Sequence, residues 1–197
     1  MTHNGREVEI KLAVSGAGEA RRMLRAAGFR VFKRRVFEKN TVFDTSSQTL
    51  RKSARLLRVR EIGKIGKLTY KGPPEGGKHK SREELELDLS DTRAITAIFD
   101  RLAYHPAFRY EKFRTEFRRR GSAGIAMLDE TPIGAYLELE GGPAWIDRMA
   151  SRLGFTEKDY ITASYARLYI EWCKARGVAP TNMLLARSGI HGHQSSR

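Results

Sequence analysis

The sequence contains little cysteine and no long apolar run. Its 197 residues include a single cysteine, Cys173, which excludes an internal disulfide and a cysteine-rich metal site. No apolar run reaches the about 18 residues of a membrane span, and the first residues lack a signal-peptide pattern. We therefore expect a cytoplasmic protein with no membrane partner. The five histidines lie near the termini and in expected loops, outside any metal-binding motif.

Two familiar catalytic motifs are also missing from the sequence. It has no Gly-x-x-x-x-Gly-Lys-Ser/Thr phosphate loop and no His-Glu-x-x-His zinc motif. Positive charge, by contrast, is in excess: 37 lysines and arginines against 23 acidic residues give a net charge of +14. This charge predicts attraction to a polyanion, which is nucleic acid, an anionic membrane or a small polyphosphate. Charge alone does not choose among these three.

Charged and apolar residues alternate in six short segments. In a β-strand successive side chains point to opposite faces, so each segment has a charged face, and most have an apolar face opposite it. A single strand of this kind is typical of a sheet that faces solvent, but six require another explanation. The segments cover residues 7–11, 58–60, 67–71, 82–87, 112–116 and 138–140.

The sequence predicts an α+β domain with about eight strands and three or four helices. The expected strands cover residues 7–11, 29–45 (one bent strand or two), 56–61, 67–71, 82–89, 108–120, 126–128 and 136–140. The expected helices cover residues 16–28, 91–104, 142–153 and 163–176. Links of hairpin length favour a largely antiparallel sheet. Residues 1–177 are expected to form the domain, and residues 178–197 a disordered C-terminal tail.

The apolar faces of the helices need an apolar surface to cover, which places the charged strand faces inside a closed barrel. An eight-stranded barrel has room for side chains or one small ligand. Burying many charges there is costly unless they pair or bind something ionic. A metal-bound polyphosphate meets this need, because basic side chains bind phosphate oxygens and carboxylates bind Mg²⁺ or Mn²⁺.

The order of the motifs resembles the CYTH domain family of triphosphate tunnel metalloenzymes. Glu7, Glu9 and Lys11 match its Glu-x-Glu-x-Lys signature. Further matches are Leu-Arg-x-Arg at 57–60, Thr-x-Lys at 69–71, Arg-x-Glu-x-Glu at 82–86, Lys-x-Arg at 112–114 and Leu-Asp…Gly-x-Tyr-x-Glu-x-Glu at 128–140. The resemblance covers roughly residues 6–176 and implies an antiparallel eight-stranded β-barrel, the triphosphate tunnel, flanked by helices. It is compatible with a homodimer.

The resemblance also implies roles for the tunnel residues. The divalent metal ligands would be Glu7, Glu9, Glu138 and Glu140, with Asp129 the candidate for a second metal site. The substrate phosphates would be bound by Lys11, Arg58, Arg60, Lys71, Arg82, Lys112 and Arg114. The candidate catalytic residues are Glu84, Glu86, Arg58 and Lys71, the two glutamates orienting the bases or assisting the attacking water.

Several functions remain open on the sequence alone. Hydrolysis of inorganic or nucleoside triphosphate is favoured because it asks least of the site, needing only an activated water. A class IV adenylyl cyclase, which converts ATP to cyclic AMP and pyrophosphate, is the first alternative. A non-catalytic module that binds polyphosphate or a nucleotide is the second. A basic RNA-contact protein is a further class, although the tunnel itself requires no nucleic acid. Thiamine triphosphate is disfavoured, because Ser164, Tyr165 and Arg167 stand where thiamine triphosphatases carry a lysine.

Overall fold

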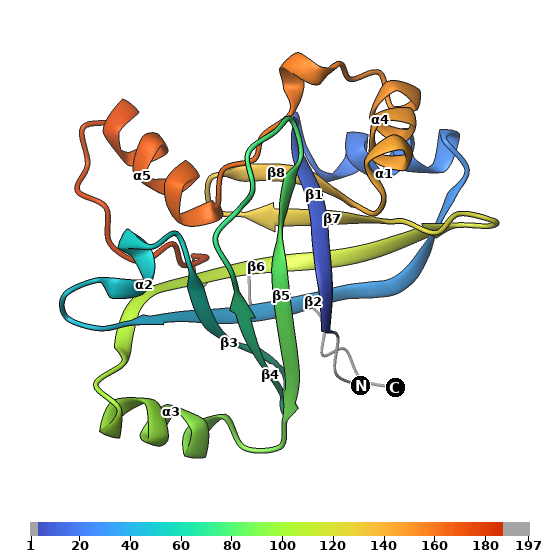
Figure 1. The fold of residues 1–197 in the computed structure, drawn as a ribbon. Helices are drawn as coiled ribbons and strands as arrows, with labels where there is room; N and C mark the ends of the chain where they lie inside the picture. Colours follow the sequence, from blue (N-terminus) through green and yellow to red (C-terminus); the bar gives the residue numbers. More distant parts are fainter. Residues whose placement is uncertain (1–3, 187–197) are drawn as a thin grey trace, which may run out of the picture.

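Eight strands form one closed antiparallel barrel in the computed structural model, which describes residues 4–186 (Figure 1). The order of neighbouring strands around the barrel is β1-β5-β4-β3-β2-β6-β7-β8. The strands are β1 (Asn4–Val14), β2 (Phe29–Asp44), β3 (Leu56–Ile62), β4 (Ile65–Lys71), β5 (Lys80–Leu89), β6 (His105–Arg119), β7 (Ile125–Thr131) and β8 (Gly134–Glu140). With the flanking helices, this confirms the predicted α+β fold.

Helices lie around the outside of the barrel (Figure 1). They are α1 (Ala17–Ala26), α2 (Thr49–Lys52), α3 (Thr92–Arg101), α4 (Pro143–Arg152), the 3₁₀ turn η1 (Glu157–Asp159) and α5 (Tyr165–Ala175). Local signals set their starts: the Asp91 carboxylate accepts hydrogen bonds from the N–H groups of Arg93 and Ala94 at α3. Pro143 occupies the first turn of α4. No helix within residues 4–186 is long and apolar enough to cross a membrane.

β2 and β6 are the two longest strands and pair along most of their length. The prediction left β2 as one bent strand or two, and the structure has one strand of 16 residues. Its pairing with β6 shifts register between Val31 and Lys33, between Lys33 and Val36, and between Val42 and Phe43. Such bulges bend a strand while it stays paired, so a single chain segment follows the curved wall.

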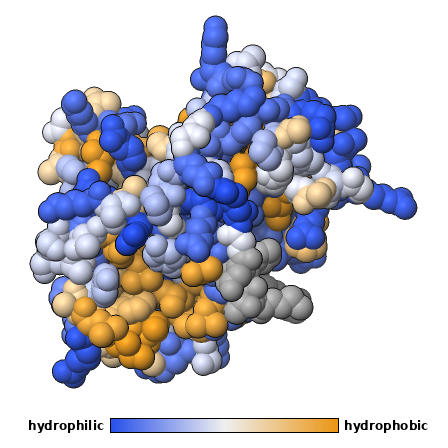
Figure 2. Space-filling view, in the orientation of Figure 1, coloured by the Kyte–Doolittle hydropathy of each residue, from blue (hydrophilic) through white to orange (hydrophobic). Residues whose placement is uncertain are grey.

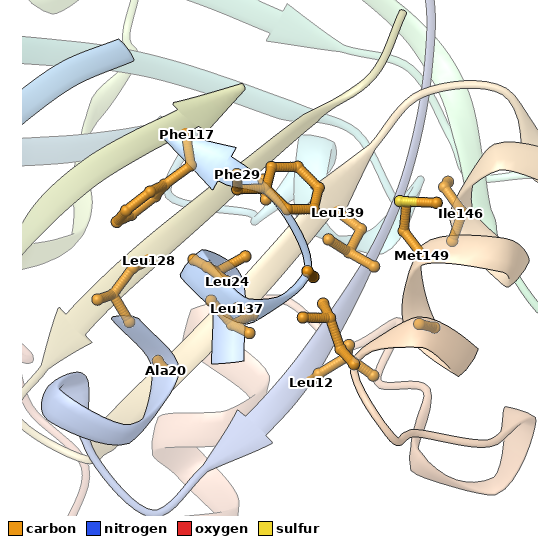
Figure 3. Close-up of a cluster of buried hydrophobic side chains, with 14 of the residues drawn as sticks. Leu12, Ala20, Leu24, Phe29, Phe117, Leu128, Leu137, Leu139, Ile146 and Met149 are labelled. Carbon is orange, nitrogen blue, oxygen red and sulfur yellow. The ribbon is translucent and has the colours of Figure 1, made fainter. Parts of the chain in front are cut away.

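The main apolar core lies outside the barrel, between its strands and helices α1 and α4 (Figure 3). Ile10 and Leu12 of β1 and Leu24 of α1 are fully buried there. Phe29 and Trp145 meet edge to face with ring centroids 6.4 Å apart. The outward faces of the strands therefore supply the apolar surface that the helices cover, and the inward faces are left for the charged residues.

Residues 178–186 follow α5 and return along β6. Met183 is buried; its N–H donates to the Arg109 carbonyl at 3.0 Å, and its own carbonyl accepts from the Glu111 N–H at 2.9 Å. The Asn182 side chain accepts from the Arg109 N–H at 2.8 Å. The expected disorder is therefore wrong for this segment, because its backbone and side chains are tied to β6. Residues 187–197 lie outside the described residues.

Candidate active site

The charged faces of the strands line one internal cavity of about 710 Å³. This volume is typical of a site for a small ligand. Thirteen of the fourteen predicted site residues line it: Glu7, Glu9, Lys11, Arg58, Arg60, Lys71, Arg82, Glu84, Glu86, Lys112, Arg114, Glu138 and Glu140. The structure thus brings residues from β1, β3, β4, β5, β6 and β8 to a single tunnel.

Four glutamates gather where β1 meets β8. In the register of this strand pair Glu9 lies opposite Glu140, and Lys11 lies opposite Glu138. Glu7 is two residues before Glu9 and shares its face of β1. Glu7, Glu9 and Glu138 are buried, and Glu140 is half-buried. Two neighbouring strands that each carry Glu-x-Glu therefore build the acidic part of the tunnel.

Glu9 is held by two lysines. Its Oε1 lies 3.3 Å from Lys11 Nζ and 3.0 Å from Lys80 Nζ. Burial alone would raise the pKa of Glu9, but Lys11 and Lys80 outweigh it and hold this pKa well below its ordinary value. Burial lowers the pKa of Lys80 to about 8, because the attraction of Glu9 only partly offsets the loss of water and the repulsion of Lys11. Lys80 is therefore able to lose its proton in mildly alkaline solution.

Glu140 differs from its three acidic neighbours. It makes no ion pair or side-chain hydrogen bond with the residues between 4 and 186. Burial, with the added repulsion of Glu7, Glu84 and Glu9, raises the pKa of Glu140 to about 7. This carboxylate thus lies in a part of the tunnel that is short of positive charge.

A divalent cation fits this acidic group by the chemistry of its donors. Mg²⁺ and Mn²⁺ prefer oxygen ligands, commonly one or two carboxylates together with phosphate oxygens and water. The raised pKa of Glu140 means that a cation bound beside it would stabilise its charged form. Within the described chain, no three Asp, Glu, His or Cys side chains already surround one point, since Glu7 and Glu138 are held by Lys71 and Arg114. The assignment of the ligands therefore stays a prediction.

Buried basic residues lie on β3 and β6, the two strands on either side of β2. Arg58 of β3 and Lys112 and Arg114 of β6 are buried. Arg58 donates from Nη1 to the Tyr110 hydroxyl and from Nη2 to the Thr69 hydroxyl, each at 3.1 Å. Its Nε has no hydrogen-bond partner among the described residues. Arg58 thus keeps a buried donor for an oxygen of a bound anion.

Lys71 and Glu84 connect the acidic and basic parts of the tunnel. Lys71 pairs with Glu7 and, at 3.1 Å, with Glu84. Burial raises the pKa of Glu84, and the repulsion of Glu7 and Glu86 adds to this effect although Lys71 opposes it. A carboxylate that binds protons more tightly than usual is suited to accept one in general-base catalysis.

Asp129 is the predicted site residue that does not line the cavity. It is fully buried, and its oxygens accept from Lys112 Nζ at 2.6 Å, from Arg114 Nε at 2.7 Å and from the Tyr165 hydroxyl at 2.7 Å. Burial alone would raise the pKa of Asp129, but Arg114 and Lys112 hold it well below its ordinary value. Asp129 thereby orients the side chains of Lys112 and Arg114. Tyr165, expected only as core packing of the last helix, reaches into this network.

Three polar residues of the tunnel wall were missed by the sequence reasoning. Lys80 falls in a loop expected at residues 72–80 because of its glycines and prolines, yet it begins β5. Glu38 lines the cavity, and Asn40 lies two residues further along the same strand. Arg60 Nε lies 3.6 Å from Glu38 and donates to Asn40 at 3.2 Å. The spacing of residues 38 and 40 was the available signal, hidden by the aromatic character of the surrounding segment.

The family of the chain is decided by a match over most of its length. The model of the CYTH domain matches residues 5–173. The chain belongs to the CYTH domain family. CYTH proteins are triphosphate tunnel metalloenzymes, a group of enzymes that act on triphosphates and use a divalent metal. The matched region contains every predicted site residue, from Glu7 to Glu140.

Relatives of this CYTH protein carry more than one name. A Methanocaldococcus jannaschii protein, provisionally named an adenylate cyclase, is 28% identical over 134 residues, which are 68% of this chain and 75% of the relative. A structure from Vibrio parahaemolyticus, also provisionally named an adenylate cyclase, has a TM-score of 0.70 at 20% identity, covering 84% of this chain and 98% of that one. A Hippeastrum protein described by its dominant triphosphatase activity has a TM-score of 0.62 at 17% identity, covering 88% and 97%. These structural likenesses show the shared fold.

Proposed function

We propose that this CYTH protein is a divalent-metal-dependent hydrolase that acts on inorganic or nucleoside triphosphate inside the tunnel. The observation that carries the proposal is one cavity of about 710 Å³ whose lining combines glutamates of β1, β5 and β8 with buried arginines and lysines. A triphosphate bound to a metal ion carries both signs of charge. It therefore offers partners to both the carboxylates and the basic side chains of this cavity, which a simple anion or cation would not.

The basic residues are suited to bind and orient the phosphates. Arg58 offers its unpartnered Nε, while Arg114 and Lys112 are held in fixed directions by Asp129. Arginine forks match phosphate oxygens in bidentate geometry, and their fixed positions favour a single substrate orientation. Glu9, Glu138 and the neighbouring carboxylates would hold the cation, which when bound offsets charge on the phosphates and lowers the pKa of water.

Glu84 is the proposed proton acceptor. It lies beside Lys71, and its pKa is raised by burial and by Glu7 and Glu86. In hydrolysis, the attacking water would lose a proton to Glu84 as its oxygen bonds to the terminal phosphorus and the bond to the leaving phosphate breaks. Lys71 would balance the charge of Glu84 before this transfer and that of the departing phosphate after it.

Cyclisation of ATP is the second candidate function. The provisional adenylate cyclase name of the Methanocaldococcus jannaschii relative favours it. The reaction needs the ribose 3′-oxygen in line with the α-phosphorus, with pyrophosphate as the leaving group. Both reactions use the same phosphate-binding residues, so the products distinguish them.

The test is to incubate the purified protein with ATP or tripolyphosphate and either Mg²⁺ or Mn²⁺, and to resolve every product by anion-exchange chromatography. Phosphate release without cyclic AMP supports the hydrolase. Cyclic AMP and pyrophosphate in equal amounts would replace it with the cyclase. Tight tripolyphosphate binding with no turnover would show a binding module instead.

Glu138→Gln and Glu83→Gln form a matched pair for the same assay. Glu138 is buried in the tunnel, whereas Glu83 is exposed on β5. We expect Glu138→Gln to lower turnover about 100-fold or more, as loss of a group that stabilises a transition-state charge does. Glu83→Gln is expected to keep wild-type turnover. Equal turnover of the two variants would contradict the assignment of Glu138.

A further inference from the structure

The paired ends of β2 and β6 carry a dense set of arginines. We name residues 29–36 together with residues 114–120 the basic ribbon. Among the residues that the structure describes, five of its arginines form no ion pair: Arg30, Arg34, Arg118, Arg119 and Arg120. Arg30 lies directly opposite Arg118 in the register of the two strands. Like charges in this position destabilise a sheet, so the arrangement favours an external anion.

Acidic residues near the basic ribbon are already engaged. Glu116 lies 3.0 Å from Lys33, and Glu130 lies 3.0 Å from Arg35 and 2.9 Å from Arg21. The carboxylates of Glu116 and Glu130 are therefore already neutralised by Lys33, Arg35 and Arg21. Arg30, Arg34, Arg118 and Arg120 are exposed and can contact phosphates, whereas Arg119 is half-buried.

An exposed aromatic ring lies among these charges. Phe32 is 50% exposed, and the Arg118 guanidinium lies 3.9 Å from the centre of its ring. A ring with a stacked guanidinium is the kind of surface on which an unpaired nucleobase stacks. Lys33 and Arg118 also line the tunnel cavity, so the basic ribbon borders one of its openings.

We propose that the basic ribbon binds single-stranded nucleic acid. Its arginines contact successive phosphates and Phe32 stacks on a base. The hydrolytic function proposed above is not needed for this, because the ribbon contacts the sugar-phosphate chain and the tunnel contacts a triphosphate. Either proposal can therefore fail while the other holds.

The chemistry of the basic ribbon favours a nucleic acid over a lipid surface. Val31 and Phe32 are its only large exposed apolar side chains among the described residues. Membrane-surface elements bury a wider apolar face together with their basic residues. A larger group of exposed apolar side chains lies on β4 and β5 and at α3, where Figure 2 shows an apolar patch: Ile65, Leu85, Leu87, Ile98 and Leu102.

The test is fluorescence anisotropy with a 5′-hydroxyl oligouridine of twelve nucleotides, which lacks the triphosphate that the tunnel is proposed to bind. We expect a Kd of roughly 1–10 µM in about 50 mM NaCl, and a slope of log K against log salt of roughly −3 for four or five phosphate contacts. Arg30→Ala/Arg34→Ala/Arg120→Ala is expected to weaken binding by at least about 20-fold and to reduce that slope. Phe32→Ala is expected to weaken it about 10-fold without changing the slope.

The matched control removes three cations from another part of the surface. Arg51, Lys52 and Arg55 are exposed near α2, on the side of the barrel away from the β6–β7 hairpin (Figure 1). Their triple alanine variant is expected to bind RNA within about 3-fold of wild type. Equal losses in both triple variants would mean attraction by net charge and would overturn the proposal. Binding to phosphatidylserine vesicles but not to the oligouridine would assign the ribbon to a membrane surface instead.

Discussion

The two faces of β1 are both buried, yet different forces hold them. Ile10 and Leu12 pack outside the barrel against apolar side chains, while Glu7, Glu9 and Lys11 lie inside it among opposite charges. Burial of apolar area stabilises a fold by about 25 cal/mol per Å². Buried ion pairs often add nothing to stability, because desolvation offsets their attraction. One strand thus serves stability with one face and ligand binding with the other.

The largest effect that would test this comparison is on activity. Glu9→Gln is expected to lower triphosphate turnover about 100-fold or more, because it removes a charge proposed to hold the metal. The Tm should fall by less than about 5 °C, since Lys11 keeps Glu138 at 3.3 Å and Lys80 can lose its proton: its pKa is about 8 with Glu9 present and falls further without that charge. Product analysis and thermal unfolding monitored by circular dichroism measure the two effects. A large loss of Tm with unchanged turnover of the remaining folded protein would mean that the charged face of β1 serves stability and not catalysis.

A substitution on the apolar face of β1 should lower stability and leave turnover nearly unchanged. Leu12 is fully buried, so Leu12→Ala leaves a cavity and should reduce the free energy of unfolding by about 3 kcal/mol. For a domain of this size the Tm should fall by roughly 6–12 °C. Turnover well below the new Tm is expected within about 3-fold of wild type. If turnover falls as far as in Glu9→Gln, the outer face also positions the site.

The smallest expected effect is on the free energy of unfolding and concerns Glu140, whose carboxylate forms no ion pair with the described residues. The pKa of Glu140 is raised from 4.5 to about 7, so the folded chain binds this proton more tightly than the unfolded chain. The free energy of unfolding must then fall as the pH rises from about 4.5 to about 7. Glu140→Gln removes this penalty and should stabilise the protein at pH 8 by roughly 1–2 kcal/mol, a value reduced for its partial exposure.

Thermal unfolding in EDTA at two pH values measures that difference. The gain of Glu140→Gln should be present at pH 8 and several-fold smaller at pH 5, where Glu140 of the folded wild type is already protonated. Saturating Mn²⁺ should reduce the gain at pH 8, because the cation would stabilise the wild-type carboxylate. The same gain at both pH values would show that Glu140 is not short of positive charge.

Regular strands made much of this tunnel predictable. Glu7 to Lys11 and Arg58 to Arg60 alternate without interruption, so the face of each side chain follows from the period of two. The prediction was weaker where the backbone departs from that period. The bulges of β2 hide the alternation that places Glu38 inside, and the breaker-rich loop hides the start of β5 at Lys80.

Contacts between distant parts of the chain escaped the sequence. The sequence around Asp129 does not indicate that its carboxylate accepts a hydrogen bond from Tyr165, because Tyr165 lies on a helix 36 residues later. Residues 178–186 have little regular pattern, yet Met183 is buried against β6. Both features depend on how helices and the C-terminal segment dock on the barrel, which side-chain periodicity does not encode.

Closure of the barrel also determines when the site can exist during synthesis. β1 pairs with both β5 and β8, so the strand made first is completed by the strand made last. Until residues 134–140 leave the ribosome, Glu9 and Lys11 lack Glu140 and Glu138 as neighbours, and the sheet has two open edges. A chain that lacks β8 therefore has an open sheet in place of a closed tunnel. The acidic group is complete only when β8 pairs with β1, which brings together residues more than a hundred positions apart.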